Sequence, residues 1–464
     1  MLRASEVAER LGIPSVSIIA SGFMKQAAVT SKGMGIPFAI AEYPGVPMVD
    51  SDETLRSKVI DHLLPAVIKG LTARKVEAEV VTEREPEPGS VVFEGSLDEV
   101  EQHFHARMWS DGLPIIPPTR QRVDAFLKFT DRNPADVIAV LPQEGRAASI
   151  HSIAVNGVMA GCRPEYMPLL IAAVEVLADP NFRIEDAGST PSWEPLVIVN
   201  GPIIKDIALN YGGGVMKIGR QANSSIGRFV RLYMRNLCGY RIPPGEGDKG
   251  SIGATFNVAL AEDEDSTRDI GWPTFAMDQG FAADENVVTM QSVVCYTAPT
   301  YSSGATAVTH ARQFVDAMGP AFAYWSYTGV KRGIWHPLLV IGPSIARVIA
   351  SQWTKDQLRQ YLWENTTIPA SLMQQLAVQT GAQPLDFKRV IAEGLLPPDY
   401  VASDDPHRPV RIYVKPEHIG IVVAGDSGRN QSRGYMPNHT QGARTSHRVQ
   451  LPQNWKQLLA SVRG

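Results

Sequence analysis

The sequence predicts an α/β protein with a small, incomplete doubly wound parallel-sheet domain followed by a larger domain built on a mixed sheet. Short β-branched apolar segments alternate with helical segments from the N-terminus onward. A strand followed by a Gly-Pro turn also occurs twice, as PLVIVNGPIIKDIA from Pro195 and as PLLVIGPSIARVIA from Pro337. We expect a first domain over residues 1–76, an acidic, proline-rich linker over 77–95, and the larger domain over 96–464.

The composition narrows the class of protein. The 464 residues carry 44 Lys and Arg against 48 Asp and Glu, and this balance gives no bias toward nucleic acid or an anionic membrane. No apolar run approaches the length of a membrane span. Three cysteines without paired spacing fit a reducing compartment. We therefore expect a cytoplasmic protein with neither a nucleic-acid nor a membrane partner.

The first domain has the helix–strand rhythm of a parallel sheet with crossover helices. The last of its helices places apolar residues on one wide face. A doubly wound domain normally begins with a strand, and its chemistry usually lies in the turn after that strand. We therefore expect the opening strand and its loop to be missing. The predicted elements are a helix over Leu2–Leu11, a strand over Ser15–Ala20, a helix over Met24–Lys32, a strand over Phe38–Glu42 and a helix over Leu55–Leu71.

This first segment resembles a known family. Ala4–Pro14 followed by SVSIIASGFMKQAAVTSKGMGIPFAIAEYP is similar to the UGSC-motif proteins, named for a selenocysteine-or-cysteine, Gly, Ser, Cys loop. In that family the loop lies just before a helix like Leu2–Leu11. The resemblance implies a redox or nucleophilic thiol or selenol site, but the motif is absent from this chain. A selenocysteine codon read as a stop would place the start at Met1, so we expect an N-terminally truncated or split protein.

The larger domain is predicted to open with a capped helix and a rigid arm. Ser96 begins a capping-box pattern for a helix to about Met108. The proline-rich segment Trp109–Thr119 is then expected to deliver Asp111 as a loop. Further on we expect a helix capped by Thr119, a strand over Asp136–Leu141, a helix over Ile150–Met159, a helix from Pro164, a strand over Leu196–Val199, a strand over Gly253–Leu260, a helix over Thr306–Met318, a helix from Thr354 to about Trp363, and a looser third strand–Gly unit at Ile419–Gly428.

A glycine-rich loop and the helix after it form the candidate anion site. We expect this helix to begin near Ser224, which places Arg228 in the first turn, where the helix macrodipole disfavours a cation. An anion held by the loop amides and the helix N-terminus would relieve that conflict. The alternative is a surface loop with solvated arginines. With neither a Walker A nor a dinucleotide pattern, a small carboxylate or phosphate is favoured over a nucleotide. The candidate substrate-binding residues are Gly212, Gly213, Gly214, Arg220, Asn223, Ser224, Arg228 and Asp111.

Cys162 is the candidate catalytic residue. It precedes a predicted helix N-terminus and lies beside Arg163, and both influences lower the pKa of a thiol. The alternative is a small buried residue at a corner between two helices. The histidines suggest no metal site, because His439 and His447 have no cysteine or carboxylate at ligand spacing. The cofactor is unknown. The tail from Ser427, rich in Gly, Arg, Asn and His, is expected either to close over a site or to form a surface loop.

Two hypotheses of function follow. The first is a thiol- or selenol-dependent enzyme, or the larger part of one, that acts on a small anionic substrate with redox chemistry as one option. The second is a non-catalytic binding or scaffold subunit completed by a partner that carries the UGSC motif. The partners considered are therefore a small anionic molecule, and either a second copy of the chain or a protein that supplies the missing N-terminal strand.

Overall fold

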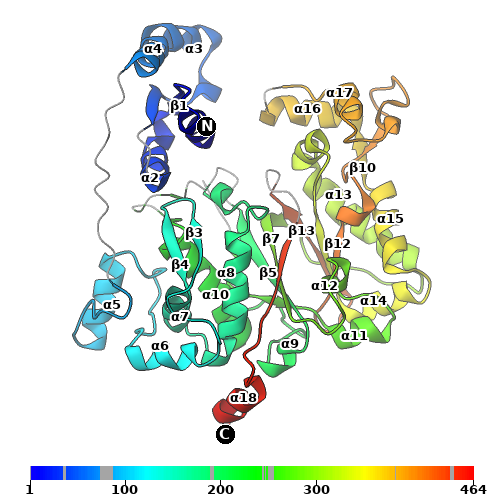
Figure 1. The fold of residues 1–464 in the computed structure, drawn as a ribbon. Coiled ribbons are helices and arrows are strands. Elements are labelled where there is room, and N and C mark those ends of the chain that lie inside the picture. The colour runs from blue at the N-terminus through cyan, green and yellow to red at the C-terminus, as the bar shows by residue number, and fades with distance from the viewer. Residues whose placement is uncertain are drawn as a thin grey trace.

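The computed structural model describes residues 2–34, 38–73, 87–188, 193–242, 245, 247–248, 255–381, 383–438 and 444–463 (Figure 1). The protein is a mixed α/β protein, as predicted. Of the expected linker, residues 77–86 lie outside this description, and residues 87–95 contain neither helix nor strand. Among the described helices, none combines the length and apolar character that a membrane crossing requires.

The N-terminal unit has the order of elements expected from the sequence. Strands β1 and β2 pair in parallel, with Val16 opposite Ala39 and Ala20 opposite Tyr43. The long helix predicted after β2 is interrupted by one π-helical turn, Val59–Leu63. The elements are α1 (Leu2–Arg10), β1 (Val16–Ala20), α2 (Met24–Met34), β2 (Ala39–Tyr43), α3 (Asp52–Lys58) and α4 (Leu64–Thr72).

Helices cover both faces of this two-stranded sheet. On one face Leu2 of α1, Ile19 of β1 and Ala27 of α2 form a buried cluster. On the other face Gly70 of α4 lies so close to Val16 and Ala39 that a Cβ there would meet them at 2.7 and 3.1 Å. A small residue is therefore required where α4 crosses the sheet, and the unit is doubly wound on the scale of two strands.

The larger domain opens with the elements that the sequence predicted. The capping box at Ser96 and Glu99 is present. Thr119 occupies the N-cap of its helix but makes no side-chain capping bond, contrary to expectation. The elements are α5 (Leu97–Ala106), α6 (Arg120–Leu127), the antiparallel pair β3 (Val137–Leu141) and β4 (Arg146–Ser149), α7 (Ile150–Met159) and α8 (Met167–Ala178).

The central sheet of this domain has the order β12-β9-β13-β7-β5-β6, with the short strands β14 beside β7 and β8 beside β13. β5 pairs in parallel with β6, and β9 pairs in parallel with β12. The pairs β5–β7, β7–β13 and β13–β9 are antiparallel. The strands are β5 (Glu194–Asn200), β6 (Leu260–Ala261), β7 (Val287–Tyr296), β8 (Thr300–Tyr301), β9 (Leu338–Ile341), β12 (Gly420–Val423), β13 (Gln431–Pro437) and β14 (Thr445–Arg448).

The internal sequence repeat corresponds to two similar halves of this sheet. Each half has a first strand ended by a Gly-Pro turn (β5, β9), a parallel neighbour (β6, β12) and a long antiparallel strand (β7, β13). The last short strand of each half crosses to the other half, β8 to β13 and β14 to β7. The expected third copy at Ile419–Gly428 contains β12, which is the counterpart of β6 rather than a further repeat.

The two Gly-Pro turns do not share one edge of the sheet. Three antiparallel steps separate β5 from β9, so the two strands run in opposite directions. Gly201 has a φ of +97° and lies against Glu285 and Asn286, just before β7. The two turns therefore do not line a common ligand edge, because the central strands reverse direction between the halves.

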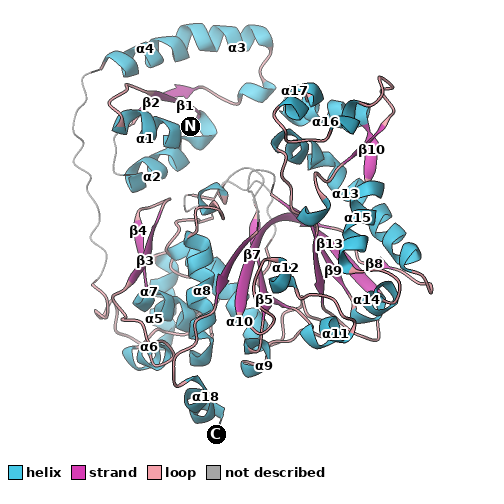
Figure 2. Cartoon of the chain, turned by 45° about the vertical axis from the view of Figure 1, so that its right-hand side comes forward, coloured by secondary structure: helices cyan, strands magenta, loops and turns pink. Residues whose placement is uncertain are grey.

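The sheet curls until its two edge strands approach each other. The backbone N–H of Asp263, after β6, donates to the carbonyl of Val423 at the end of β12. The inward face of the sheet is filled by one apolar cluster with members from each of the strands in the order β12-β9-β13-β7-β5-β6, including Ile198, Leu260 and Val422. Helices α7, α8 and α10 (Gln221–Asn236) cover the outer face of the first half, and α13 (Ala307–Arg332) with α14 (Pro343–Ala350) covers that of the second (Figure 2).

The remaining described elements connect these layers. The helix expected over Thr306–Met318 continues as α13 through Pro320 to Arg332. The strand expected over Gly253–Leu260 is reduced to β6, and residues 251–254 lie outside the description. The elements are α9 (Ile203–Asp206), α11 (Glu264–Asp269), α12 (Phe275–Asp278), α15 (Lys355–Asn365), α16 (Ala370–Gly381), α17 (Phe387–Ala392), α18 (Trp455–Arg463), and the pair β10 (Thr367–Pro369) and β11 (Pro409–Arg411).

A buried ionic seam joins the two halves where the edge strands meet. Asp278, from the first half, accepts from Lys355 at 2.6 Å and from Arg359 at 2.5 Å, both from the second half. Glu262, fully buried in the first half, accepts from the Asn200 amide and the Phe275 backbone N–H. Across the seam Glu262 interacts with the charge of Lys355. Because Asp278, Lys355 and Arg359 have lost their hydration, each depends on its partner in the other half.

We predict that Asp278→Ala lowers the free energy of unfolding by about 3–5 kcal/mol, because it leaves two buried cations without their shared carboxylate. Asp356→Ala is the matched control. The Asp356 side chain also contacts Arg359, at 2.5 Å, but it is 87% exposed, and its loss should cost less than about 1 kcal/mol. Urea unfolding measures both variants, and equal losses would contradict a stabilising role for the seam.

Glu262 gives a pH-dependent prediction. Burial raises the pKa of Glu262 to about 7 and outweighs the opposing effect of Lys355. Between about pH 4.5 and about pH 7, Glu262 is protonated in the folded protein and ionised in the unfolded chain. The contribution of Glu262 therefore lowers the free energy of unfolding as the pH rises through this range. His336 and His418, whose pKa values burial lowers, act in the opposite sense, so the test compares a variant with the natural chain.

Relative to the natural chain, Glu262→Gln should gain more than about 1 kcal/mol of stability between pH ~5 and pH ~8, since one pKa unit corresponds to about 1.4 kcal/mol. Chemical unfolding at the two pH values gives the difference. A stability difference that does not change with pH would show that Glu262 titrates as an exposed carboxyl group does.

Candidate functional site

The helix of the expected anion site begins earlier than the sequence suggested. Helix α10 starts at Gln221, and Arg220 occupies the N-cap without a side-chain capping bond. Asn223 and Ser224 therefore lie inside the first turn and do not cap the helix. Arg228 lies about two turns in, beyond the region where the macrodipole acts on a charge. The predicted electrostatic conflict at Arg228 is absent for this reason.

Arg228 and Asp111 do come together, but as an internal ion pair. Arg228 Nε and Nη2 donate to the two carboxylate oxygens of Asp111, each at 2.8 Å, and Nη2 also donates to the carbonyl of Pro114. Burial opposes ionisation of Asp111, but the fork and charge of Arg228 outweigh it, and the pKa of Asp111 is lowered. The anion that neutralises Arg228 is thus supplied by the arm Trp109–Thr119.

The other candidate binding residues serve mainly to hold the loop. The Asn223 side chain accepts from the Asn210 backbone N–H and donates to the carbonyls of Asn210 and Ala259. Ser224 Oγ accepts from the Gly219 N–H, and the Gly212 N–H donates to the Asn210 side chain. Among Gly212, Gly213 and Gly214, only Gly214 has a positive φ, +70°. The expected nest of converging glycine amides is not formed, and Arg220, Gly213 and Gly214 are exposed.

Cys162 is buried, with 9% of its surface exposed. Its Sγ donates to the carbonyl of Ser225 at 3.3 Å. Burial raises the pKa of Cys162 to about 12, although that hydrogen bond and the charge of Arg228 act to lower it. Arg163, expected to activate the thiol, instead pairs with Glu165 at 2.7 Å. The expectation of a lowered pKa is therefore wrong, and the geometry is that of a small residue at a helix–helix corner.

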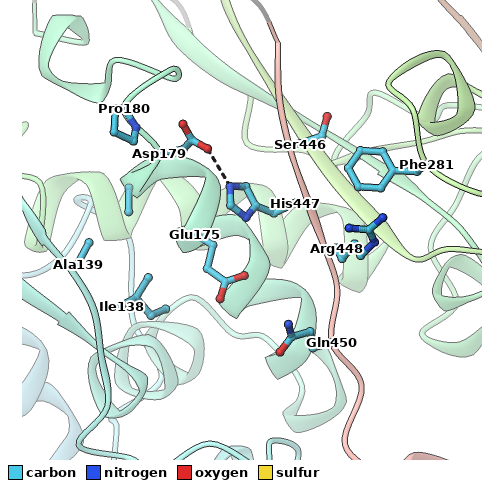
Figure 3. Close-up of a pocket in the computed structure, with 11 residues that line it drawn as sticks. Ile138, Ala139, Glu175, Asp179, Pro180, Phe281, Ser446, His447, Arg448 and Gln450 are labelled. Atoms are coloured by element: carbon cyan, nitrogen blue, oxygen red, sulfur yellow. Dashed lines mark hydrogen bonds and ion pairs between the residues drawn. The ribbon is translucent and has the colours of Figure 1, made fainter.

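A surface cleft of about 550 Å³ lies elsewhere in the larger domain (Figure 3). Its walls come from β3, from the C-terminal end of α8 and from β14, and its volume suits a small molecule. Along β14 successive side chains point to opposite sides. Figure 3 shows His447 on the side of Glu175 and Asp179, and Arg448 on the side of Phe281. The lining residues are Ile138, Ala139, Glu175, Ala178, Asp179, Pro180, Phe281, Ser446, His447, Arg448 and Gln450.

His447 and Asp179 form a hydrogen-bonded pair in this cleft, with His447 Nε2 at 3.0 Å from Asp179 Oδ2. The backbone N–H of Asn181 donates to the other carboxylate oxygen at 2.8 Å. Burial opposes ionisation of Asp179, but these two hydrogen bonds outweigh it and lower its pKa. An ionised Asp179 accepts a hydrogen bond from the Nε2–H group, so Nδ1 of the neutral ring retains its lone pair. The pair has the arrangement of an oriented proton acceptor.

Two further charged residues line the cleft, the acidic Glu175 and the basic Arg448, and each forms an ion pair with a residue outside the lining. Glu175 accepts from Arg132 at 2.7 Å, while Arg448 donates to Glu285 at 2.5 Å and lies over the Phe281 ring. The Arg448 side chain is 62% exposed, which leaves much of its guanidinium to solvent. The cleft therefore offers an acidic wall beside His447 and a cationic, aromatic wall beside Arg448.

Sequence reasoning missed the His447–Asp179 pair because 268 residues separate its members. The only signal was the composition of the tail from Ser427. That tail is no surface loop in its described part, since it forms β13 and β14 inside the central sheet. Its residues Ser446, His447 and Arg448 line the cleft of Figure 3, and the expectation that the tail closes over a site stays a prediction.

Comparisons with known proteins return no family: neither a protein-family model nor a curated protein matches the chain. In the described part of the chain, no group of three or more His, Cys, Asp or Glu residues is arranged to hold a metal ion.

We predict that Cys162 resists iodoacetamide in the native protein at about pH 8 and reacts only on unfolding, because the thiolate is the nucleophile and burial disfavours it. Cys295 is partly exposed and is the internal comparison, expected to react first. Mass spectrometry of the alkylated peptides over time measures both rates. Faster reaction at Cys162 than at Cys295 would restore the interpretation of Cys162 as an activated thiol.

Proposed function

We propose that the chain is an enzyme, or the larger part of one, that binds a small anionic substrate in the cleft of Figure 3 and transfers a proton at His447. The observation that carries this proposal is the oriented His447–Asp179 pair at the wall of a cavity of small-molecule size. Arg448 is the group that would attract a carboxylate or phosphate, because its side chain is 62% exposed and a guanidinium can form forked hydrogen bonds.

In this proposal the chain's residues have separate roles. Asp179 fixes the ring of His447 and its tautomer, so that Nδ1 accepts a proton from the substrate and later returns it. Phe281 supports Arg448 from below through its ring. Glu175, held by Arg132, keeps this wall acidic and disfavours a substrate whose negative charge lies next to His447.

The thiol or selenol implied by the UGSC resemblance has no evident source in this chain. Burial raises the pKa of all three cysteines, Cys162, Cys238 and Cys295. We therefore propose that any such group comes from a partner. All three cysteines are free, which fits a reducing compartment, and we propose that the protein acts in the cytoplasm.

One observation favours the alternative of a subunit completed by a partner. Among the described residues, the N-terminal sheet has only β1 and β2, and Ile18 in β1 is 39% exposed. An added strand would pair with a free sheet edge and cover such apolar surface. In this second proposal the partner brings the strand and the motif, and the larger domain binds without catalysis.

We predict that Arg448→Gln weakens the binding of the best ligand in a panel of small carboxylates and phosphates by about ten- to a hundred-fold, the cost of one charge-assisted contact. Arg347→Gln, at an exposed position of α14 outside the lining of the cleft, is the matched control and should leave affinity unchanged. Calorimetric titration of the full chain measures both.

A second readout of this experiment tests His447 itself. Bound ligand should protect His447 from acylation by diethyl pyrocarbonate, while the exposed His407 should react equally with and without ligand. Equal binding by the natural chain and by Arg448→Gln, with no protection of His447, would leave the cleft without a function and favour the partner-completed subunit.

A further inference from the structure

A second cluster of polar side chains able to bind a ligand lies at the start of strands β9 and β12, and several of its polar atoms are buried. His336 precedes β9 and His418 precedes β12, and these two strands lie side by side. The two imidazole rings stack with their centroids 4.3 Å apart and their planes 34° from parallel. This pair takes no part in the cleft of Figure 3, whose lining does not include it.

The polar atoms of this cluster lack partners. Among the described residues, neither ring nitrogen of His336 has a hydrogen-bond partner, and the same holds for Nδ1 of His418 and Nε2 of Gln291. Nearly all buried polar atoms of folded proteins are hydrogen-bonded, and exceptions point to an absent water, ion or ligand. Arg444 bonds to Gln291 and His418, and the His336 ring stacks on that of His418, so the four atoms belong to one cluster and indicate a shared cause.

Arg444 brings a positive charge to the same place. Its Nε donates to Gln291 Oε1 at 3.0 Å, and its Nη2 donates to the carbonyls of Pro337 and His418. These neutral acceptors satisfy hydrogen bonds, but they do not balance the charge. No described carboxylate forms an ion pair with Arg444, and Asp278, whose charge acts on it, is already shared by Lys355 and Arg359. Burial, and to a lesser extent the charge of Arg359, lower the pKa of Arg444 to about 9, and Asp278 only partly opposes them.

We propose that His336, His418, Gln291 and Arg444 form an internal binding site for a small carboxylate anion. Arg444 balances the charge, and the Gln291 amide and the neutral imidazoles supply N–H donors. A metal cation does not fit, because the guanidinium would repel it. The donor-rich surroundings and the planar guanidinium suit a planar carboxylate.

The proposed site does not depend on the function proposed for the cleft. The two sites are joined by one short segment, because Arg444 directly precedes β14 and His447 lies within it. The cleft lining includes none of the residues of the internal site. Loss of cleft binding in Arg448→Gln would leave the internal site intact, so the two proposals can fail separately.

The test uses His336→Phe, which removes both unpartnered ring nitrogens and keeps a ring of similar shape. Formate and acetate are titrated into the full chain, and thermal unfolding and calorimetry report binding. We expect one carboxylate to bind the natural chain and Arg448→Gln alike at this site. His336→Phe should bind at least tenfold more weakly and should lose the anion-dependent rise in unfolding temperature.

His407→Phe is the matched control, because His407 is exposed and its replacement should leave the carboxylate response unchanged. Should His336→Phe fail to fold, Gln291→Leu provides a second variant, and it should also weaken binding. The proposal is overturned by either of two results: no carboxylate-dependent stabilisation of the natural chain, or an equal stabilisation of His336→Phe.

Discussion

The buried ionic seam is the interaction on which the architecture of the larger domain depends. Its acids, Glu262 and Asp278, come from the first half of the sheet, and its bases, Lys355 and Arg359, come from the second. Neither half can leave the other without exposing apolar surface and leaving charges buried without partners. The halves are therefore expected to fold as one cooperative unit, although each repeats the same order of strands.

The exchange of terminal strands has a direct consequence for the candidate site. Because β14 crosses from the second half to pair with β7 of the first, His447 reaches Asp179 at the end of α8. The cleft thus has walls from both halves. The exchange is unequal in the two halves, since β8, the counterpart of β14, has only two residues, Thr300 and Tyr301.

Local patterns in the sequence predicted local structure well. The helix Ile150–Met159 and the capping box at Ser96 follow from short-range rules and are present as expected.

Partners that lie far apart in the sequence could not be predicted by such short-range rules. Arg228 and Asp111 were both singled out, but their 117-residue separation hid that they neutralise each other. For Cys162, two local influences favoured a thiolate, yet burial, which only the tertiary structure reveals, outweighs both. The same holds for α13, where packing against the sheet carries the helix past Pro320.

The position of His447 depends on the register of β14, and Arg444 lies at the point where this register is set. Thr445 pairs with Met290 and His447 with Val288. A slip of one residue would turn His447 away from Asp179 and place Arg448 there instead. Just before the strand, Arg444 donates to Gln291 on β7 and to the carbonyls of Pro337 and His418, which hold the start of β14 to both halves. The His447–Asp179 pair at the surface and the cluster around Arg444 are therefore placed by the same few contacts.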